Sequence, residues 1–192
     1  MRDMEMLDSD TIHRPLTVAE FNKMVEVGII APDERVELVD GELIAMPPMG
    51  PPHASIVGRM IHVLLDRLGT VASIRPQLPA VASQWSQPQP DVALVRRRDD
   101  FYRSKHPAPE DIFAVVEVSD SMLAFDRGPK RRMYAKAGIV EYWIVDVPAM
   151  TIEAYRDPHD IGYGAPLVAA RGERVSFAAF PEVAFAVEEL IG

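Results

Sequence analysis

The chain has 192 residues, a formal net charge of −9 and no cysteine. Its length and its 48% hydrophobic content predict one domain with a substantial core. The absence of cysteine excludes disulfides, thiolate metal sites and cysteine nucleophiles, and the excess of acids argues against tight, non-specific binding of nucleic acid, which depends on Lys and Arg neutralising phosphates.

The start of the chain mixes acids with scattered apolar residues and has no signal-type apolar core. We expect a mobile tail over residues 1–14 and a single domain over residues 15–192. No run of the sequence is long and apolar enough to span a membrane, so a cytoplasmic protein without membrane contact is the expectation.

A helix opens the predicted domain. Thr17 and Glu20 have the spacing of a capping box, so the helix should run from Thr17 to about Gly28. Its expected buried stripe consists of Phe21, Met24 and Val25.

A hairpin and a second helix follow. The runs 36–39 and 42–46 alternate around Asp40-Gly41, a dipeptide that favours a tight hairpin turn. After a proline-rich loop, residues 53–68 have helical spacing and are followed by a glycine stop. The apolar stripe of this helix comprises Ile56, Met60, Val63, Leu64 and Leu68.

Three further apolar runs, 71–81, 90–96 and 112–118, predict successive strands between turn-rich connections. The second run carries Asp91 and the third carries Glu117. A lone carboxylate on a buried strand loses hydration, and two that converge also repel each other. A divalent metal relieves both problems, so the two acids predict a metal site.

The second half of the chain predicts a crossover. Residues 126–136 have helical spacing, and Pro129 should stand at the first helical position. Strands should follow over 140–146 and 151–155. Because strand, helix and strand occur in this order, the strand ending at Glu117 and the next strand should be parallel. We expect a glycine-broken hairpin and a short terminal helix over residues 161–192.

From about Leu16 to the C-terminus the chain resembles the Uma family of restriction endonucleases, a branch of the PD-(D/E)xK nuclease superfamily. No single motif carries the resemblance; the ordered set does. Its pieces are Arg35 to Glu42, His53 at a helix start, Pro90-Asp91-Val92, Val116-Glu117-Val118-Ser119, and Lys130 through Trp143 with Tyr134, Gly138, Glu141 and Tyr142.

The resemblance implies an α/β (α+β) fold, a mixed β-sheet core flanked by helices, with the N-terminal helix and hairpin added. It implies hydrolysis of DNA by an endonuclease that uses Mg²⁺ or Mn²⁺. The implied metal ligands are Asp91, Glu117 and the main-chain carbonyl of Val118, which are the oxygen donors that Mg²⁺ prefers. A homodimer is also implied, because a duplex has two strands to cut.

One position departs from the superfamily pattern. The lysine expected two residues after the second acid is absent, and Ser119 stands there. The resemblance points to Lys130 on the following helix as its replacement, where it would hold the attacking water or the phosphate. Ser119 itself reads as a capping hydroxyl, because no histidine lies near it in sequence.

Three more residues take site roles from the resemblance. Glu37 would bind metal through water or orient Lys130, and a surface acid on a hairpin explains it equally well. His53 would reach the substrate or cap its helix. Tyr134 lies one helical turn after Lys130 and would stack on a base, although core packing is the stronger reading.

Simpler explanations stay open for the other site residues. Asp91 could be a turn carboxylate after Pro90, and Glu117 a strand-end acid paired with a neighbour. Asp126 and Lys130 have the spacing of a helix ion pair. The whole chain could be a catalytically silent nuclease fold that binds nucleic acid or assembles with a partner, or a hydrolase of smaller phosphodiesters.

Two basic runs stand out in this acidic chain, residues 96–98 and 130–132. Because each lies near the end of an element that carries a site residue, they could form a positive rim around the site. Solvated loop and helix faces explain them equally well.

Overall fold

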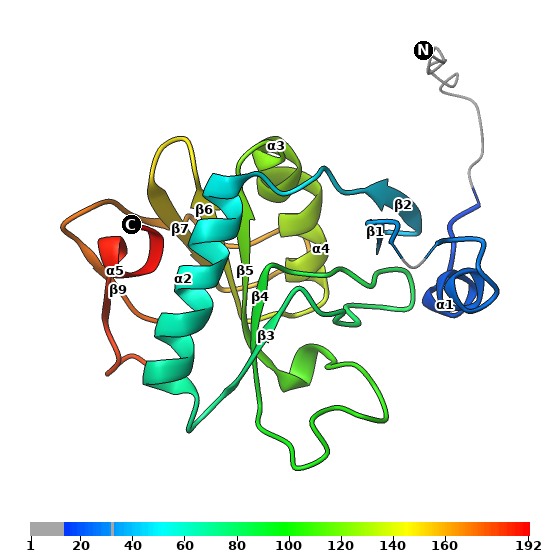
Figure 1. Ribbon diagram of the computed structural model, residues 1–192, viewed down its shortest axis with the longest axis horizontal. Helices are drawn as coiled ribbons and strands as arrows, with labels where there is room; N and C mark the ends of the chain where they lie inside the picture. Colours follow the sequence, from blue (N-terminus) through cyan, green and yellow to red (C-terminus); the bar gives the residue numbers. More distant parts are fainter. Residues whose placement is uncertain (1–13, 32) are drawn as a thin grey trace.

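The computed structural model of the protein describes residues 14–31 and 33–192. Its centre is a mixed six-stranded sheet in the order β3-β4-β5-β6-β7-β8. The strands are β3 (Ser73–Pro76), β4 (Val92–Val95), β5 (Ile112–Ser119), β6 (Glu141–Asp146), β7 (Thr151–Arg156) and β8 (Leu167–Ala169). Helices flank this sheet (Figure 1), as predicted.

One face of the sheet packs against α2 (Pro51–Leu68) and α5 (Val187–Ile191), and the other against α4 (Arg131–Lys136). Successive side chains of a strand point to opposite faces. On β5, Val116 and Val118 therefore pack on the α2 side, while Val115 packs on the α4 side. Glu117 has the same parity as Val115, which directs its carboxylate toward α4.

The crossover prediction is confirmed. β5 pairs with β6 in parallel, and the helical segments between them cover one face of the sheet. The other pairs of the sheet are antiparallel, including β4 with β5. Because β4 and β5 run in opposite directions, the start of β4 lies beside the end of β5. Asp91, just before β4, is thereby brought to the same end of the sheet as Glu117.

The predicted hairpin is present as β1 (Val36–Val39) and β2 (Glu42–Ala45). Asp40 and Gly41 form its turn with φ of 49° and 84°, as a two-residue turn with two left-handed positions requires. The first helix, α1 (Val18–Glu26), has Thr17 as N-cap with the complete capping box. Of its expected stripe Phe21 is buried, whereas Val25 is 44% exposed, because the helix contacts its small core along a narrower face.

The predicted start of the third helix at Pro129 is wrong. Helical structure already begins with α3 (Leu123–Phe125), and a π-helical turn (Asp126–Lys130) joins it to α4. A proline inside a helix normally loses a hydrogen bond and collides with the preceding turn. The wider π turn accommodates Pro129, and the chain continues into α4 without a break.

Two other predictions differ from the structure. The strand expected over 71–81 is only β3, because Gln77 adopts a left-handed backbone conformation with φ of 49° directly after Pro76. The glycine-broken hairpin expected over 161–192 is present only as a short antiparallel pair, β9 (Arg174–Val175) with β10 (Phe185–Ala186), whose connection has no glycine, while β8 joins β7 in the main sheet. The short terminal helix is present as α5, and a short 3₁₀ helix, Pro109–Asp111, precedes β5.

The predicted mobile tail over 1–14 lies outside the described residues except for Arg14. Within the described ranges, every helix is too short or too polar to cross a membrane.

Candidate active site

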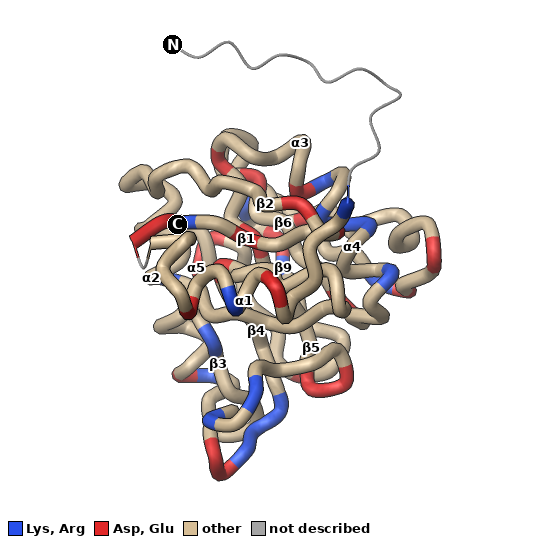
Figure 2. The backbone as a smooth tube through the Cα atoms, turned by 90° about the vertical axis from the view of Figure 1, so that its right-hand side faces the viewer, with Lys and Arg blue, Asp and Glu red and all other residues tan. Residues whose placement is uncertain are grey.

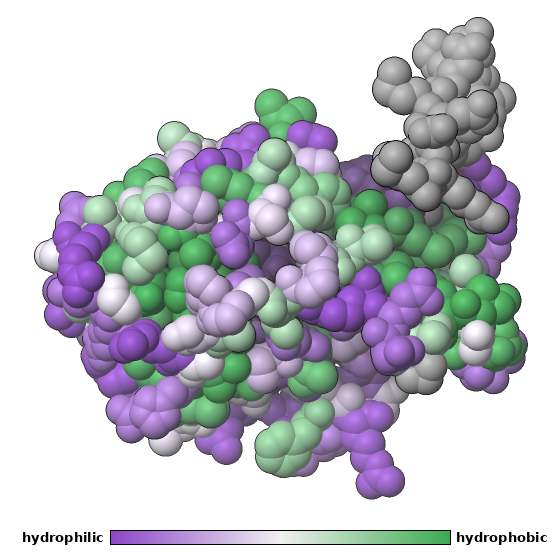
Figure 3. Space-filling model, turned by 45° about the horizontal axis from the view of Figure 1, so that its top comes forward, coloured by the Kyte–Doolittle hydropathy of each residue, from purple (hydrophilic) through white to green (hydrophobic). Residues whose placement is uncertain are grey.

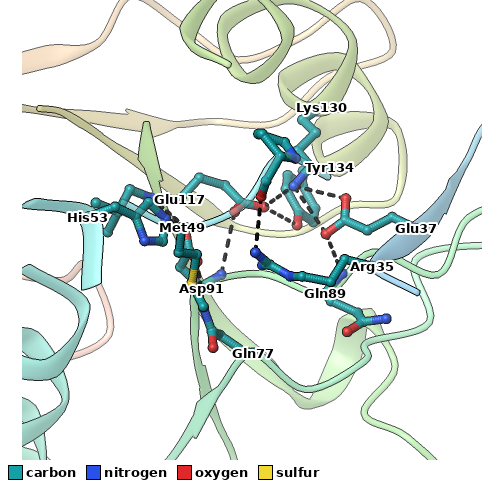
Figure 4. Close-up of polar contacts among 12 residues, drawn as sticks. Arg35, Glu37, Met49, His53, Gln77, Gln89, Asp91, Glu117, Lys130 and Tyr134 are labelled. Carbon is teal, nitrogen blue, oxygen red and sulfur yellow. Dashed lines mark hydrogen bonds and ion pairs between the residues drawn. The ribbon is translucent and has the colours of Figure 1, made fainter. Parts of the chain in front are cut away.

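Asp91 and Glu117 lie side by side at one end of the sheet (Figure 4). The Asp91 main-chain N–H donates to Glu117 Oε2 at 3.4 Å, and the Val118 N–H donates to Asp91 Oδ2 at 2.9 Å. Both side chains are buried, with residue exposures of 9% for Asp91 and 3% for Glu117. The two acids predicted to converge are therefore neighbours in a partly enclosed place.

Lys130 joins them from the π turn. Its ammonium lies 2.9 Å from Glu117 Oε1 and 3.0 Å from Glu37 Oε2, and the residue has no exposed surface. Glu37, on β1, is 1% exposed, so the reading of it as a surface acid is wrong. Within the described chain, Lys130 forms ion pairs with Glu117 and Glu37. It does not form the helix ion pair with Asp126 that the four-residue spacing allowed.

Tyr134 also contacts Glu117. It follows Lys130 by four residues, which places both side chains on one helix face. Its hydroxyl donates to Glu117 Oε1 at 2.8 Å, and the residue is 1% exposed. Because its ring is buried, Tyr134 cannot stack on a base in this structure. Its hydroxyl instead orients the Glu117 carboxylate. Lys136, by contrast, is exposed on the same helix.

Three further residues complete the surroundings. His53, in the first turn of α2, has Nε2 3.0 Å from Asp91 Oδ2. Gln77 donates through Nε2 to Asp91 Oδ1 at 3.3 Å. The Gln89 main-chain N–H donates to Glu37 Oε1 at 2.9 Å. Gln77 and Gln89 were not predicted as site residues, because an amide after a proline or in a loop carries no signal until its neighbours are known.

The charges of the site do not balance. Burial raises the pKa of the Glu117 carboxyl well above its ordinary value; the Lys130 charge opposes this rise, and the carboxylates of Asp126, Asp91 and Glu37 add to it. Burial likewise raises the pKa of Asp126. Burial would lower the pKa of Lys130, but the surrounding carboxylates outweigh it and raise the pKa. Four acids thus share this region with the protonated ammonium of Lys130, which contacts two of them, and with Arg35, which lines the same cavity.

The residues fit a hard divalent cation in their chemistry. Asp91, Glu117 and Val118 line one cavity together with His53 and Lys130, and the space-filling view is hollowed on this side of the molecule (Figure 3). In an extended strand the N–H and C=O of one residue point toward the same neighbouring strand, so the Val118 carbonyl faces the Asp91 side.

No cluster of three or more Asp, Glu, His or Cys side chains arranged to hold a metal occurs in residues 14–31 and 33–192. Mg²⁺, however, is usually held by one or two carboxylates and keeps several waters. Two carboxylates and a main-chain carbonyl supply oxygen donors of the kind that such an ion requires. The excess of acids over basic groups in the site also favours a cation.

The two basic runs do not form a rim around this cavity. Residues 96–98 follow β4 and therefore lie at the end of that strand opposite Asp91, where Figure 2 shows basic residues gathered below β3. In the other run, Lys130 is buried within the site, and the Arg131 guanidinium lies over the Tyr155 ring at 5.5 Å.

Comparisons with known proteins agree with this architecture. Residues 18–188 match the family model Uma2, described as "Putative restriction endonuclease". The fold is similar to the crystal structure of "a putative nuclease belonging to DUF820" from Anabaena variabilis, with a TM-score of 0.71 and 17% sequence identity over 92% of this chain and 98% of that chain. At that identity the likeness shows a shared fold. No curated protein matches the chain.

Proposed function

The chain belongs to the Uma2 family, a family of restriction-endonuclease-like nucleases, and we propose that it is a metal-dependent endonuclease that hydrolyses phosphodiester bonds in DNA. The observation that carries the proposal is the convergence of Asp91, Glu117 and the buried Lys130 in one cavity. Burying these charges is costly, and packing alone gives no reason to gather them.

Phosphodiester hydrolysis needs an activated water, stabilisation of charge on the transferring phosphate and help for the leaving oxygen. A bound Mg²⁺ or Mn²⁺ supplies a Lewis acid and lowers the pKa of water. Asp91, Glu117 and the Val118 carbonyl are the groups that would hold it.

The oxygens of these two carboxylates are occupied unequally. Oε1 of Glu117 accepts from Lys130 and Tyr134, whereas Oε2 accepts only the 3.4 Å bond from the Asp91 main-chain N–H, so Oε2 is the oxygen more available to a metal ion. Oδ2 of Asp91 contacts the Val118 N–H and His53, and Oδ1 contacts only the Gln77 amide. Each acid therefore has one oxygen fixed by the protein and one with few or no side-chain donors.

Lys130 acts as a charged donor in this proposal. Because its pKa is raised, it stays protonated at neutral pH and cannot remove a proton from water. An ammonium held by Glu117 and Glu37 can instead orient the attacking water or stabilise negative charge developing on the phosphate. Glu37 is then a positioning residue, since its carboxylate touches Lys130.

His53 is the candidate for contact with substrate. Its side chain is 13% exposed, it lines the cavity, and its Nδ1 has no hydrogen-bond partner among the described residues. Because Nδ1 is itself buried and Nε2 contacts Asp91, a substrate would meet the exposed edge of the ring.

A catalytically silent nuclease fold is the alternative. The net charge of −9 weakens attraction to DNA, and Ser119 stands where the superfamily has its lysine. In that case the protein would bind nucleic acid or a partner without cutting.

Self-association stays part of the proposal, as a symmetric dimer that presents two sites to a duplex. The apolar run 183–187 gives it no support, because Phe185 and Val187 are fully buried in the protomer's own core. Light scattering at micromolar concentration tests it, and a monomer removes the dimer while leaving the chemistry untouched.

The test of the main proposal is cleavage of supercoiled plasmid DNA. Wild-type protein should cut with Mg²⁺ or Mn²⁺ and stop when a chelator is added, whereas Ca²⁺ should bind without supporting cutting. Asp91→Ala and Glu117→Ala should abolish cleavage and weaken metal binding, while Asp66→Ala, an exposed acid on α2, should match wild type. Equal cleavage by Asp91→Ala and wild type would contradict the assignment, and DNA binding without any cutting would favour the silent alternative.

A further inference from the structure

A basic loop connects β4 to the short 3₁₀ helix before β5. Residues 96–105 contain five basic side chains and two acids, in a chain whose net charge is −9. The basic members are Arg96, Arg97, Arg98, Arg103 and Lys105. Figure 2 shows this concentration at the end of the sheet away from α3, with acids among the basic residues, and Arg98 is ion-paired with Asp100. A local positive surface is thus present on an acidic protein, away from the cavity described above.

An exposed aromatic ring stands at the tip of this loop. Phe101 is 77% exposed, whereas the next residue, Tyr102, is 6% exposed and donates through its hydroxyl to the Arg96 carbonyl at 2.7 Å. Both have left-handed backbone conformations, with φ of 50° and 60°. Such conformations are unfavourable for bulky residues and persist only where the surroundings impose them. The anchored Tyr102 therefore holds Phe101 out in solvent.

Two arginines line the same hollow as the Phe101 ring. Arg75 on β3 has its guanidinium 5.3 Å from the centre of the Tyr102 ring, and Arg97 donates to the Thr70 carbonyl at 2.8 Å. Neither forms an ion pair within the described ranges of the chain, so both charges remain available for an anion.

The Phe101 hollow and the Asp91 hollow lie along the same edge strand, although they share no lining residue. β3 is the edge strand of the sheet. Gln77, just after it, lines a hollow shared with Asp91, and the next residue, Leu78, lines the Phe101 hollow. At about 3.3 Å per residue, a strand as short as β3 separates the two hollows by little more than about 10 Å.

We propose that a single strand of nucleic acid emerging from the Asp91 cavity follows the edge of β3 and binds to this loop. Arg75 and Arg97 would contact its phosphates, and one unpaired base would stack on Phe101. A positive groove that tracks the backbone, combined with an exposed aromatic ring, is the physical basis of single-strand binding. The choice of nucleic acid rests on the proposed function, but the binding requires neither metal nor cleavage.

Binding is measured by fluorescence anisotropy with a labelled single-stranded oligodeoxynucleotide and a blunt duplex of the same sequence, in the presence of chelator. Phe101→Ala should weaken single-strand binding by roughly fivefold or more, because stacking on an aromatic ring contributes that much per base. Duplex binding should be unchanged. Phe101→Tyr should keep wild-type affinity, and Ile161→Ala, which removes a side chain that is 81% exposed, is the matched control.

Charge is tested by salt dependence. The Arg75→Gln/Arg97→Gln double variant should reduce the slope of log affinity against log salt by about 0.7 for each lost phosphate contact. Arg171→Gln, an exposed arginine near the C-terminus, should leave the slope unchanged.

The inference is overturned if wild-type protein does not bind the single strand, if Phe101→Ala binds it as wild type does, or if Phe101→Ala weakens duplex binding equally. These outcomes are separate from the proposed function. Metal-dependent cleavage with a silent Phe101→Ala would sustain the nuclease and remove the strand path, whereas Phe101-dependent binding without any cleavage would do the reverse.

Discussion

The hydroxyl of Tyr134 donates a hydrogen bond to Glu117 Oε1, the same oxygen that accepts one from the Lys130 ammonium. Two donors from one helix face thus fix one oxygen of the acid, while the other accepts only the 3.4 Å bond from the Asp91 main-chain N–H. The helix over β5 therefore fixes the orientation of the Glu117 carboxylate, the group that would hold the proposed metal ion.

Tyr134→Phe tests this positioning role. The ring packing survives, but the Glu117 carboxylate loses the hydrogen bond that it accepts from the Tyr134 hydroxyl. A hydrogen bond to a charged group contributes about 1.5–3 kcal/mol. We expect a folded protein that binds Mn²⁺ more weakly in calorimetry and cleaves more slowly at saturating metal. If Tyr134 serves only core packing, Tyr134→Phe should bind Mn²⁺ and cleave DNA as the wild-type protein does.

Lys130→Met should separate metal binding from turnover. Removing the ammonium frees Glu117 and Glu37 from their ion pairs, so affinity for Mn²⁺ should rise. The cleavage rate at saturating metal should nevertheless fall by at least about tenfold, or about 1.4 kcal/mol of transition-state stabilisation.

The matched control is Lys136→Met, because Lys136 is exposed on the same helix and should be silent. If Lys136→Met instead lowers the cleavage rate, the functional lysine is Lys136 and not Lys130. Normal cleavage by both variants would mean that no lysine on this helix replaces the one missing at Ser119, and would favour the silent alternative.

Local rules predicted local structure well. The Asp40-Gly41 turn and the Thr17 capping box follow from backbone geometry and from hydrogen bonds within a few residues, and both are present. The parallel pairing of β5 with β6 followed from the handedness and order of a crossover. The parallel direction of these two strands was therefore accessible from the sequence.

Features that depend on residues far apart in the chain could not be predicted from the sequence. Glu37 looks like a solvent-facing hairpin residue until the Lys130 side chain, far along the chain, is seen to cover it. The π turn at Pro129 arises because helical structure begins upstream of the proline, which the Gly-Pro pattern could not reveal. Gln77 has no recognisable motif, and only the fold brings its amide to Asp91.

Gln77→Gly separates backbone strain from side-chain function. Glycine adopts the φ of 49° without strain, so the melting temperature should stay the same or rise. Loss of the amide removes the hydrogen bond to Asp91 Oδ1, and we expect weaker metal binding and slower cleavage. A variant that is more stable and fully active would leave Gln77 without a role at the site.

Alkaline pH should unfold the protein through its tyrosines. All five have raised pKa values, mainly through burial; for Tyr155 burial, helped by the hydrogen bond to Glu153, raises the pKa to about 12. Unfolded tyrosine loses its proton near pH 10. Above that pH the unfolded chain binds fewer protons than the folded one, so stability falls as pH rises, from about 10 through the folded pKa.

Tyrosinate absorbance and far-ultraviolet circular dichroism, followed together in one titration, provide the measurement. They should change in a single shared step above pH 10. Tyr155→Phe removes one contributing group, so its denaturation midpoint should fall less steeply between about pH 10 and about 12, the interval between the ordinary and folded pKa of Tyr155. Gradual tyrosinate formation from pH 10 with unchanged circular dichroism would mean that the rings are accessible in the folded protein. It would contradict the burial of Tyr134, Tyr142, Tyr155 and Tyr163 in one core cluster on the α4 side of the sheet.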